Sequence, residues 1–202
     1  MNTTKTYFGV VALGLMVLAT GLWAWKPVGK TRVRPVREEA VQPAIAAKEP
    51  VRREELSWMS IDEAAGKLQK EQRPILIDLY TTWCGWCKQM DKKTYSNKQV
   101  AQYLQDKFYP VKVDAETRAT INWNGRTFQF NPNYKSNEFA LYLTHGRLEF
   151  PTTIIIPPGG EPQAIPGYME PKELELLVKY FGEGKFGKVS FDEYEKGFKP
   201  SW

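Results

Sequence analysis

Cysteine and histidine are scarce in this sequence of 202 residues, which contains two cysteines and one histidine. Both cysteines, Cys84 and Cys87, belong to one Cys-x-x-Cys segment, so the chain has no disulfide framework of the kind that staples small secreted domains. Structural zinc is held by four cysteine or histidine ligands, and His145 is the only histidine available. Metal binding is therefore a minor alternative, and we expect neither a metal nor another cofactor.

The composition also lacks any extreme bias. Hydrophobic residues make up 42% and charged residues 25% of the chain, which is typical of a globular protein with one ordinary domain. The formal net charge is +5, but much of the basic excess lies between residues 26 and 53. We therefore do not expect nucleic acid as a partner.

Residues 7–25 carry no charged side chain and are long enough to cross the hydrocarbon core of a bilayer. We interpret residues 1–25 as a signal anchor, with a cleaved signal peptide as the main alternative and a buried core helix as a minor one. More basic residues follow this segment than precede it, which by the positive-inside rule argues for a cytoplasmic domain. An apolar segment at the start of a chain, ahead of a whole domain, is nevertheless typical of export, which we favour.

Residues 26–56 contain four prolines among charged residues and show neither helical nor strand periodicity. We interpret them as a flexible linker that separates the membrane segment from a folded domain at residues 57–202.

The folded domain shows strand and helix patterns in alternation, which predicts an α/β sheet. The spacing of Ser60 and Glu63 is that of a capping box at a helix start. Pro171 suits the first position of a closing helix. The predicted strands are residues 74–80, 109–113, 152–156 and 163–168, and the predicted helices are residues 61–70, 172–181, 190–198 and one that begins within the Cys-x-x-Cys segment.

The Cys-x-x-Cys spacing serves several chemistries. Zinc would need a second such pair, and haem attachment would need a histidine where Lys88 stands. At the start of a helix, free amide groups favour the thiolate of the first cysteine. We therefore expect Cys84 to be the nucleophile and Cys87 the resolving thiol of thiol-disulfide exchange, with Cys84 and Cys87 forming a redox-active disulfide. A non-catalytic binding role is the remaining alternative.

The segment Trp83-Cys84-Gly85-Trp86-Cys87, after an apolar strand, resembles the thioredoxin superfamily. The stretch from Trp58 through Asp114 also resembles the subgroup that includes bacterial periplasmic thioredoxin-like proteins and the C-terminal domain of the membrane thiol:disulfide interchange protein. The resemblance implies a thioredoxin fold, in which helices flank a central mixed sheet. It also implies a protein disulfide reductase that takes electrons from a membrane-embedded partner, anchored in a bacterial inner membrane and facing the periplasm, or secreted to the periplasm.

The resemblance also implies roles for individual residues. Asp78 occupies the place of a buried aspartate that takes a proton from the resolving cysteine, the alternative being a core polar group with its hydrogen bonds satisfied. Phe150 and Pro151 match a cis-proline loop that offers backbone to substrate, the alternative being a trans proline at an edge strand. The candidate substrate contacts are Trp83, Gly85, Trp86, Phe150 and Pro151; for Trp83, simple packing is the favoured interpretation.

Two substitutions depart from the family pattern. Trp86 replaces the usual proline between the cysteines, which leaves open whether the protein reduces disulfides or oxidises and isomerises them. The lysine that flanks the buried aspartate in the family has no aligned counterpart, because Pro110 takes its place and Lys112 lies elsewhere along the strand. We therefore expect no lysine beside Asp78.

An insertion at about residues 115–149 precedes the cis-proline loop. Within it, Asn124 and Gly125 separate two apolar stretches and predict a two-residue β-hairpin turn. A short helix is expected to begin at Ser136-Asn137-Glu138 and to run through Leu143. Because the insertion ends at the cis-proline loop, we expect its hairpin to border the active site and to select partners.

Overall fold

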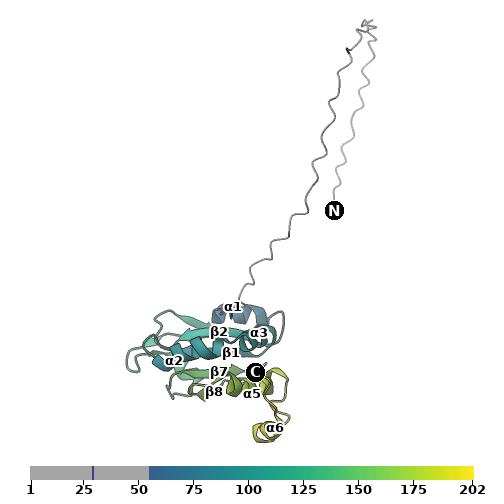
Figure 1. Ribbon diagram of the computed structural model, residues 1–202. Coiled ribbons are helices and arrows are strands. Elements are labelled where there is room, and N and C mark those ends of the chain that lie inside the picture. Colours follow the sequence, from purple (N-terminus) through teal and green to yellow (C-terminus); the bar gives the residue numbers. More distant parts are fainter. Residues whose placement is uncertain (1–28, 30–54) are drawn as a thin grey trace, which may run out of the picture. The chain divides into compact units, whose positions relative to one another are not determined.

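The computed structural model describes residue 29 and residues 55–202. A four-stranded sheet runs through the centre in the order β2-β1-β7-β8 (Figure 1). Strand β1 is parallel to β2, and the other two pairings are antiparallel, so the sheet is mixed. The strands are β1 (Ile75–Tyr80), β2 (Tyr109–Asp114), β7 (Thr152–Ile156) and β8 (Gln163–Pro166).

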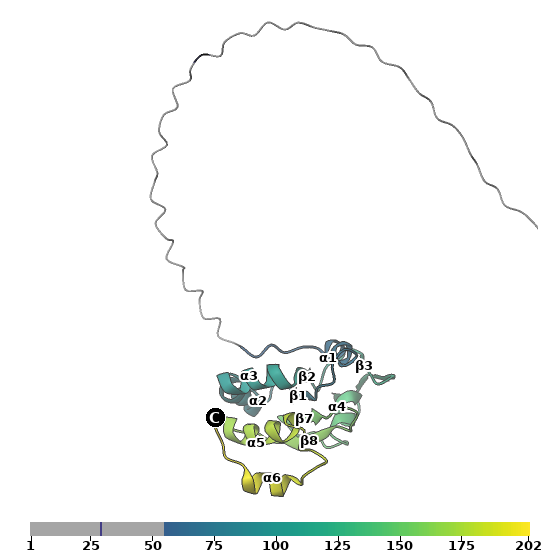
Figure 2. The ribbon, with the colours of Figure 1, turned by 90° about the vertical axis from the view of Figure 1, so that its right-hand side faces the viewer.

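Helices cover both faces of this sheet. Figure 2 shows α1 (Ile61–Leu68) and α4 (Glu138–Leu143) on one side, and α2 (Gly85–Met90), α3 (Lys98–Lys107) and α5 (Pro171–Gly182) on the other. Each face has its own apolar cluster. The predicted thioredoxin-like architecture, a mixed sheet flanked by helices, is confirmed.

Alternation along β1 decides which residues meet which helices. Ile75, Ile77 and Leu79 pack with the α1 and α4 side, whereas Leu76 packs with residues of α3 and α5. Successive side chains of a strand point to opposite faces, so Asp78 shares the face of Leu76. This is the face that α2 covers.

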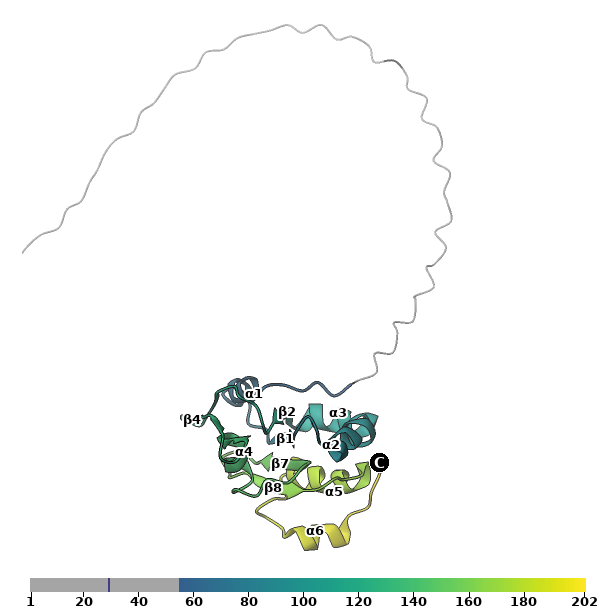
Figure 3. The same cartoon turned by 90° about the vertical axis from the view of Figure 1, so that its left-hand side faces the viewer.

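Local sequence signals account for the helix starts. Ser60 and Glu63 form the expected capping box, and Pro171 opens α5 as predicted. Helix α1 ends two residues before the predicted boundary. The segment after α2 continues as a single π-helical stretch, η1 (Asp91–Tyr95), which the sequence analysis missed. The predicted last helix is α6 (Phe191–Gly197), which lies beyond α5 in Figure 3.

The insertion contains the predicted hairpin, with β3 (Ile121–Trp123) paired to β4 (Arg126–Phe128). Asn124 and Gly125 have φ values of 49° and 73°, the left-handed values that a two-residue turn of this kind requires. The hairpin contacts α1, and Phe128 packs against Phe139 of α4. A second short pairing joins β5 (Phe130–Asn131) to β6 (Ser136–Asn137).

Asn137 ties the insertion to the end of β2. Its Oδ1 accepts the amide of Phe139 at the start of α4, and its Nδ2 donates to the carbonyl oxygens of Thr117 and Ala119 at 3.1 and 3.0 Å. Its own amide donates to the carbonyl oxygen of Ala115. The side chain of Asn137 is fully buried, so water does not reach it in the folded domain.

The predicted membrane segment at residues 1–25 and nearly all of the predicted linker lie outside the described residues. Leu56, the last residue of that linker, is buried in the apolar cluster, so packed structure begins there rather than at residue 57. Within residues 55–202, no helix combines the length and hydropathy needed to cross a bilayer.

Replacing Asn137 tests how much this anchor stabilises the domain. Asn137→Ala removes a helix cap and the donor to two partly buried carbonyl groups, so we expect the free energy of unfolding to fall by about 2 kcal/mol. Urea denaturation measures the change. Asn133→Ala, at an exposed position of the same insertion, should change it by less than about 0.5 kcal/mol. Equal effects of the two substitutions would contradict the anchoring role.

Candidate active site

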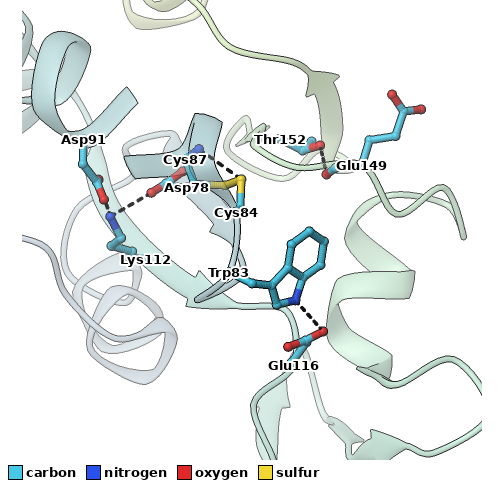
Figure 4. The surroundings of a disulfide bond; sticks show 9 residues. All are labelled: Asp78, Trp83, Cys84, Cys87, Asp91, Lys112, Glu116, Glu149 and Thr152. Atoms are coloured by element: carbon cyan, nitrogen blue, oxygen red, sulfur yellow. Dashed lines mark hydrogen bonds and ion pairs between the residues drawn. A yellow bond between two sulfur atoms is a disulfide. The ribbon is translucent and has the colours of Figure 1, made fainter. Parts of the chain in front are cut away.

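Cys84 and Cys87 lie at the amino-terminal end of α2 and are joined by a disulfide (Figure 4). Cys84 is the N-cap residue, and its Sγ accepts the amide of Cys87 at 3.0 Å. The two sulfur-bearing residues are only 4% and 3% exposed. The helix start therefore directs backbone amide groups at the sulfur of Cys84, which stabilises negative charge there once the disulfide is opened.

The segment that precedes β7 carries the expected cis peptide bond, between Phe150 and Pro151. The ring of Phe150 meets that of Trp83 edge-on, with 6.0 Å between centroids. The carbonyl oxygen of Pro151 accepts the amide of Gly167 at 2.8 Å, which ties this segment to the end of β8. The structure thus brings the Phe150–Pro151 loop and the residue before Cys84 together.

Two indole rings flank the cysteines and are largely exposed, Trp83 at 64% and Trp86 at 61%. The packing interpretation of Trp83 was therefore wrong. Its Nε1 donates to Oε1 of Glu116 at 3.0 Å, and Figure 4 shows the indole pointing toward this carboxylate. Trp86 leans against Tyr168, with ring centroids 5.5 Å apart.

Glu116 is the part of the insertion that reaches the Cys-x-x-Cys segment. The hairpin itself packs on α1 and α4, in contacts such as that between Trp123 and Phe139. Glu116 carries no sequence signal for this role, because its contact with Trp83 spans 33 positions and depends on where β2 ends.

The expectation that no lysine lies beside Asp78 was wrong. The parallel pairing of β1 and β2 starts with Ile75 opposite Tyr109, which places Lys112 opposite Asp78. Lys112 Nζ lies 3.1 Å from Asp78 Oδ2 and also contacts the carboxylate of Asp91 (Figure 4). The register between β1 and β2 thus gives Asp78 a lysine partner, which a comparison of positions along β2 alone did not predict.

Asp78 is 1% exposed, and its surroundings change its acidity. Burial raises the pKa of Asp78 to about 6, because loss of water disfavours the carboxylate more than Lys112 favours it. Burial alone would lower the pKa of Lys112, but Asp78 and Asp91 together outweigh it and raise that pKa. A carboxyl group that exchanges its proton near neutral pH thus lies under α2, as expected of a proton acceptor.

Asp91 is a site residue that the sequence analysis missed. It follows Cys87 by four positions, a spacing that puts both side chains on one side of a helix and was the available signal. It opens η1, and π-helical turns of this kind recur at functional sites.

A family model for a thioredoxin-like domain matches residues 61–182. The chain belongs to this thioredoxin-like family. The match includes β1, the Cys-x-x-Cys segment, the whole insertion and the Phe150–Pro151 loop, so the resemblance inferred from the sequence is confirmed.

This thioredoxin-like chain is similar to parts of longer proteins. Human spermatogenesis-associated protein 20 is 33% identical over 66 residues, 33% of this chain and 8% of that protein. The thiol:disulfide interchange protein DsbD of Citrobacter koseri is 45% identical over 47 residues, 23% of this chain and 7% of DsbD. The solved structure of DsbH oxidoreductase has 17% identity and a TM-score of 0.47, covering 75% of this chain and 96% of that one. The chain thus spans less than a tenth of these two curated relatives.

Within residues 55–202, no three histidine, cysteine or acidic side chains gather closely enough to hold an ion.

Substituting Asp78 tests the effect of its burial. The folded protein keeps a proton on Asp78 up to a pKa of about 6, whereas the unfolded chain releases it near pH 3.9. Through this window the folded state binds more protons, so this carboxyl group lowers the free energy of unfolding as pH rises. We expect Asp78→Asn to be more stable than the wild type by about 3 kcal/mol at pH 7, and the difference to vanish near pH 4.

Urea denaturation of the oxidised proteins from pH 4 to pH 8 measures this difference. Asp91→Asn is the matched control, because it removes the other carboxylate of Lys112 at a half-exposed position. A constant difference between Asp78→Asn and the wild type across this pH range would contradict the assignment.

Proposed function

We propose that this protein is a thiol-disulfide oxidoreductase that acts on disulfides of other proteins through Cys84 and Cys87. The observation that carries the proposal is the position of the Cys84–Cys87 disulfide, at the start of α2 and above a buried carboxyl group that is paired with a lysine. A purely structural disulfide would need neither the helix amides nor the buried Asp78, since burying a carboxylate is costly.

In the reducing direction, the Cys84 thiolate attacks a substrate disulfide, forming a mixed disulfide and expelling one substrate sulfur as a thiolate. Cys87 then attacks Cys84, which releases the second substrate sulfur. The Cys84–Cys87 disulfide forms as the substrate gains two electrons, and two protons complete its thiols. A donor dithiol must then reduce the pair for another cycle. In the oxidising direction the same steps run backwards.

Asp78 accepts the proton of Cys87 in this scheme. Cys87 must lose its proton before it can attack, and it is buried, so bulk water cannot serve it directly. Asp78 lies on the sheet face that α2 covers, and burial tunes its pKa to about 6. Lys112 stabilises the carboxylate and links it to Asp91 at the surface, which offers the proton a way out.

The exposed rings of Trp83 and Trp86, together with the Phe150–Pro151 loop, are proposed to contact the protein substrate. They surround sulfur atoms that are themselves almost inaccessible. A partner must therefore press a flat apolar surface on the indoles to bring its own disulfide to Cys84. Gly85 adds no side chain at this point, and a Cβ placed there would meet open space.

We further propose that the protein works outside the cytoplasmic membrane as a reductase or electron carrier, held by residues 1–25 and supplied with electrons by a membrane-embedded partner. The support is the uncharged run at residues 7–25 and the local similarity to DsbD. A reduction potential well below that of glutathione, measured by equilibration with glutathione redox buffers, is the expected result. A potential well above that of glutathione would make the protein an oxidase or isomerase instead.

Single cysteine substitutions test the proposed chemistry. With insulin as a protein disulfide substrate, Cys84→Ser should abolish reduction, because the attacking thiolate is gone and the remaining thiol, Cys87, is buried. Cys87→Ser should also stop turnover but accumulate a mixed disulfide at Cys84, seen as a mass increase that dithiothreitol removes. Reduction of insulin by the Cys84→Ser/Cys87→Ser double variant would sink the redox proposal and favour a client-binding role for the exposed indoles.

A further inference from the structure

Three buried oxygen atoms on the sheet face beneath α2 have no role in the exchange steps proposed above. They are Oδ1 of Asp78, Oγ1 of Thr153 and the hydroxyl of Tyr95, and none has a hydrogen-bond partner within residues 55–202. Each belongs to a residue that is 3% exposed or less. An unpaired polar atom in such a place costs about 1–3 kcal/mol, so three close together call for an explanation.

Sheet register brings two of these atoms side by side. Thr153 of β7 is the direct antiparallel partner of Asp78. Ile155, two residues further along β7, packs in the same cluster as Leu76 of β1, so Thr153 and Asp78 share the face that α2 covers. Lys112 occupies the opposite neighbour position of Asp78 and binds Oδ2, which leaves Oδ1 for the Thr153 side.

The π-helical stretch η1 supplies the third atom. Tyr95 is its last residue, and the ring packs into the same cluster, edge-on to Trp58 at 4.8 Å. Burial raises the pKa of Tyr95 well above its usual value, the Asp78 carboxylate adds to that rise, and the Thr153 hydroxyl opposes it. Tyr95 thus packs with Leu76 and Ile155 on the sheet face that carries Asp78 and Thr153, and Trp58 packs against its ring.

Hydroxyl groups suit a carboxyl group that changes its charge. A hydroxyl can donate to the carboxylate and can turn to accept from the protonated acid, whereas a lysine can only donate. Hydrogen bonds to the charged form favour that form. Two hydroxyls beside Oδ1 therefore complement Lys112 on Oδ2.

We propose that Tyr95 and Thr153 are positioning residues whose hydroxyls hydrogen-bond Asp78 Oδ1, directly or through one shared water molecule, and stabilise its charged form during thiol-disulfide exchange. This role rests on the proposed function, since it concerns the proton that Asp78 exchanges with Cys87. The other titratable groups that face Asp78 are Lys112 and Tyr80 on the neighbouring sheet positions and Asp91 on η1.

The test is the titration of the Asp78 carboxyl group itself, followed by carbon-13 NMR in the full-length oxidised protein. Tyr95→Phe and Thr153→Val each remove one hydroxyl and keep the shape. Each should raise the pH midpoint of Asp78 by about one unit, a tenfold change in its proton affinity. Thr153→Ser keeps the hydroxyl and should restore the wild-type midpoint.

Tyr103→Phe is the matched control, because the hydroxyl of this α3 residue is also buried without a partner in the described part of the chain but lies beside Gly182 of α5. It should leave the midpoint unchanged. An unchanged or lowered midpoint in both Tyr95→Phe and Thr153→Val overturns the proposal. The NMR midpoint does not depend on activity, so it stands even if insulin reduction fails.

Should either single variant fold poorly, the other variant can be tested by a second measurement. This is the pH dependence of its rate of exchange with oxidised glutathione, in which the rate falls toward acid pH along an acid limb. That limb should move to higher pH by the same amount. A lower rate with an unmoved limb would show a merely structural effect and would also count against the proposal.

Discussion

A carboxylate buried against a lysine is the constraint on which this domain depends. Asp78 reaches Lys112 only when β1 and β2 pair in parallel with one particular register, and a shift by one residue would leave a buried charge alone. Helix α2 covers the same face of the sheet. The ion pair of Asp78 and Lys112 therefore lies on the face beneath the helix that carries the cysteines. Because burial raises the pKa of Asp78, the carboxylate lowers the free energy of unfolding at neutral pH.

The same arrangement separates reactivity from recognition. The sulfur atoms of Cys84 and Cys87 are almost fully covered, whereas the indoles of Trp83 and Trp86 beside them are mostly exposed. A backbone amide at the start of α2 donates to the sulfur of Cys84, and the exposed indoles form the surface that is proposed to contact a partner. Under the proposed function, a partner that fits this surface would gain access to Cys84, and exchange with other disulfides would be limited.

The insertion connects to this site through its beginning rather than its hairpin. Asn137 and Ser136 bind backbone groups at the end of β2, and Glu116, directly after that point, holds the indole of Trp83. The hairpin around Asn124 rests on α1 and α4 and extends the core. The insertion thus contacts the Cys-x-x-Cys segment through Glu116.

Short-range signals in the sequence determined a large part of the protein: the capping box at Ser60, the apolar strands, the Asn124-Gly125 turn and the Cys-x-x-Cys segment at a helix start all depend on neighbours within a few residues. Tertiary structure decided the rest. Lys112, Glu116 and Thr153 became site residues through strand register and chain return, and Trp83 proved mostly exposed although Phe150 and Glu116 contact its ring. Such contacts depend on which distant segments meet, and no periodicity within one strand or helix encodes that.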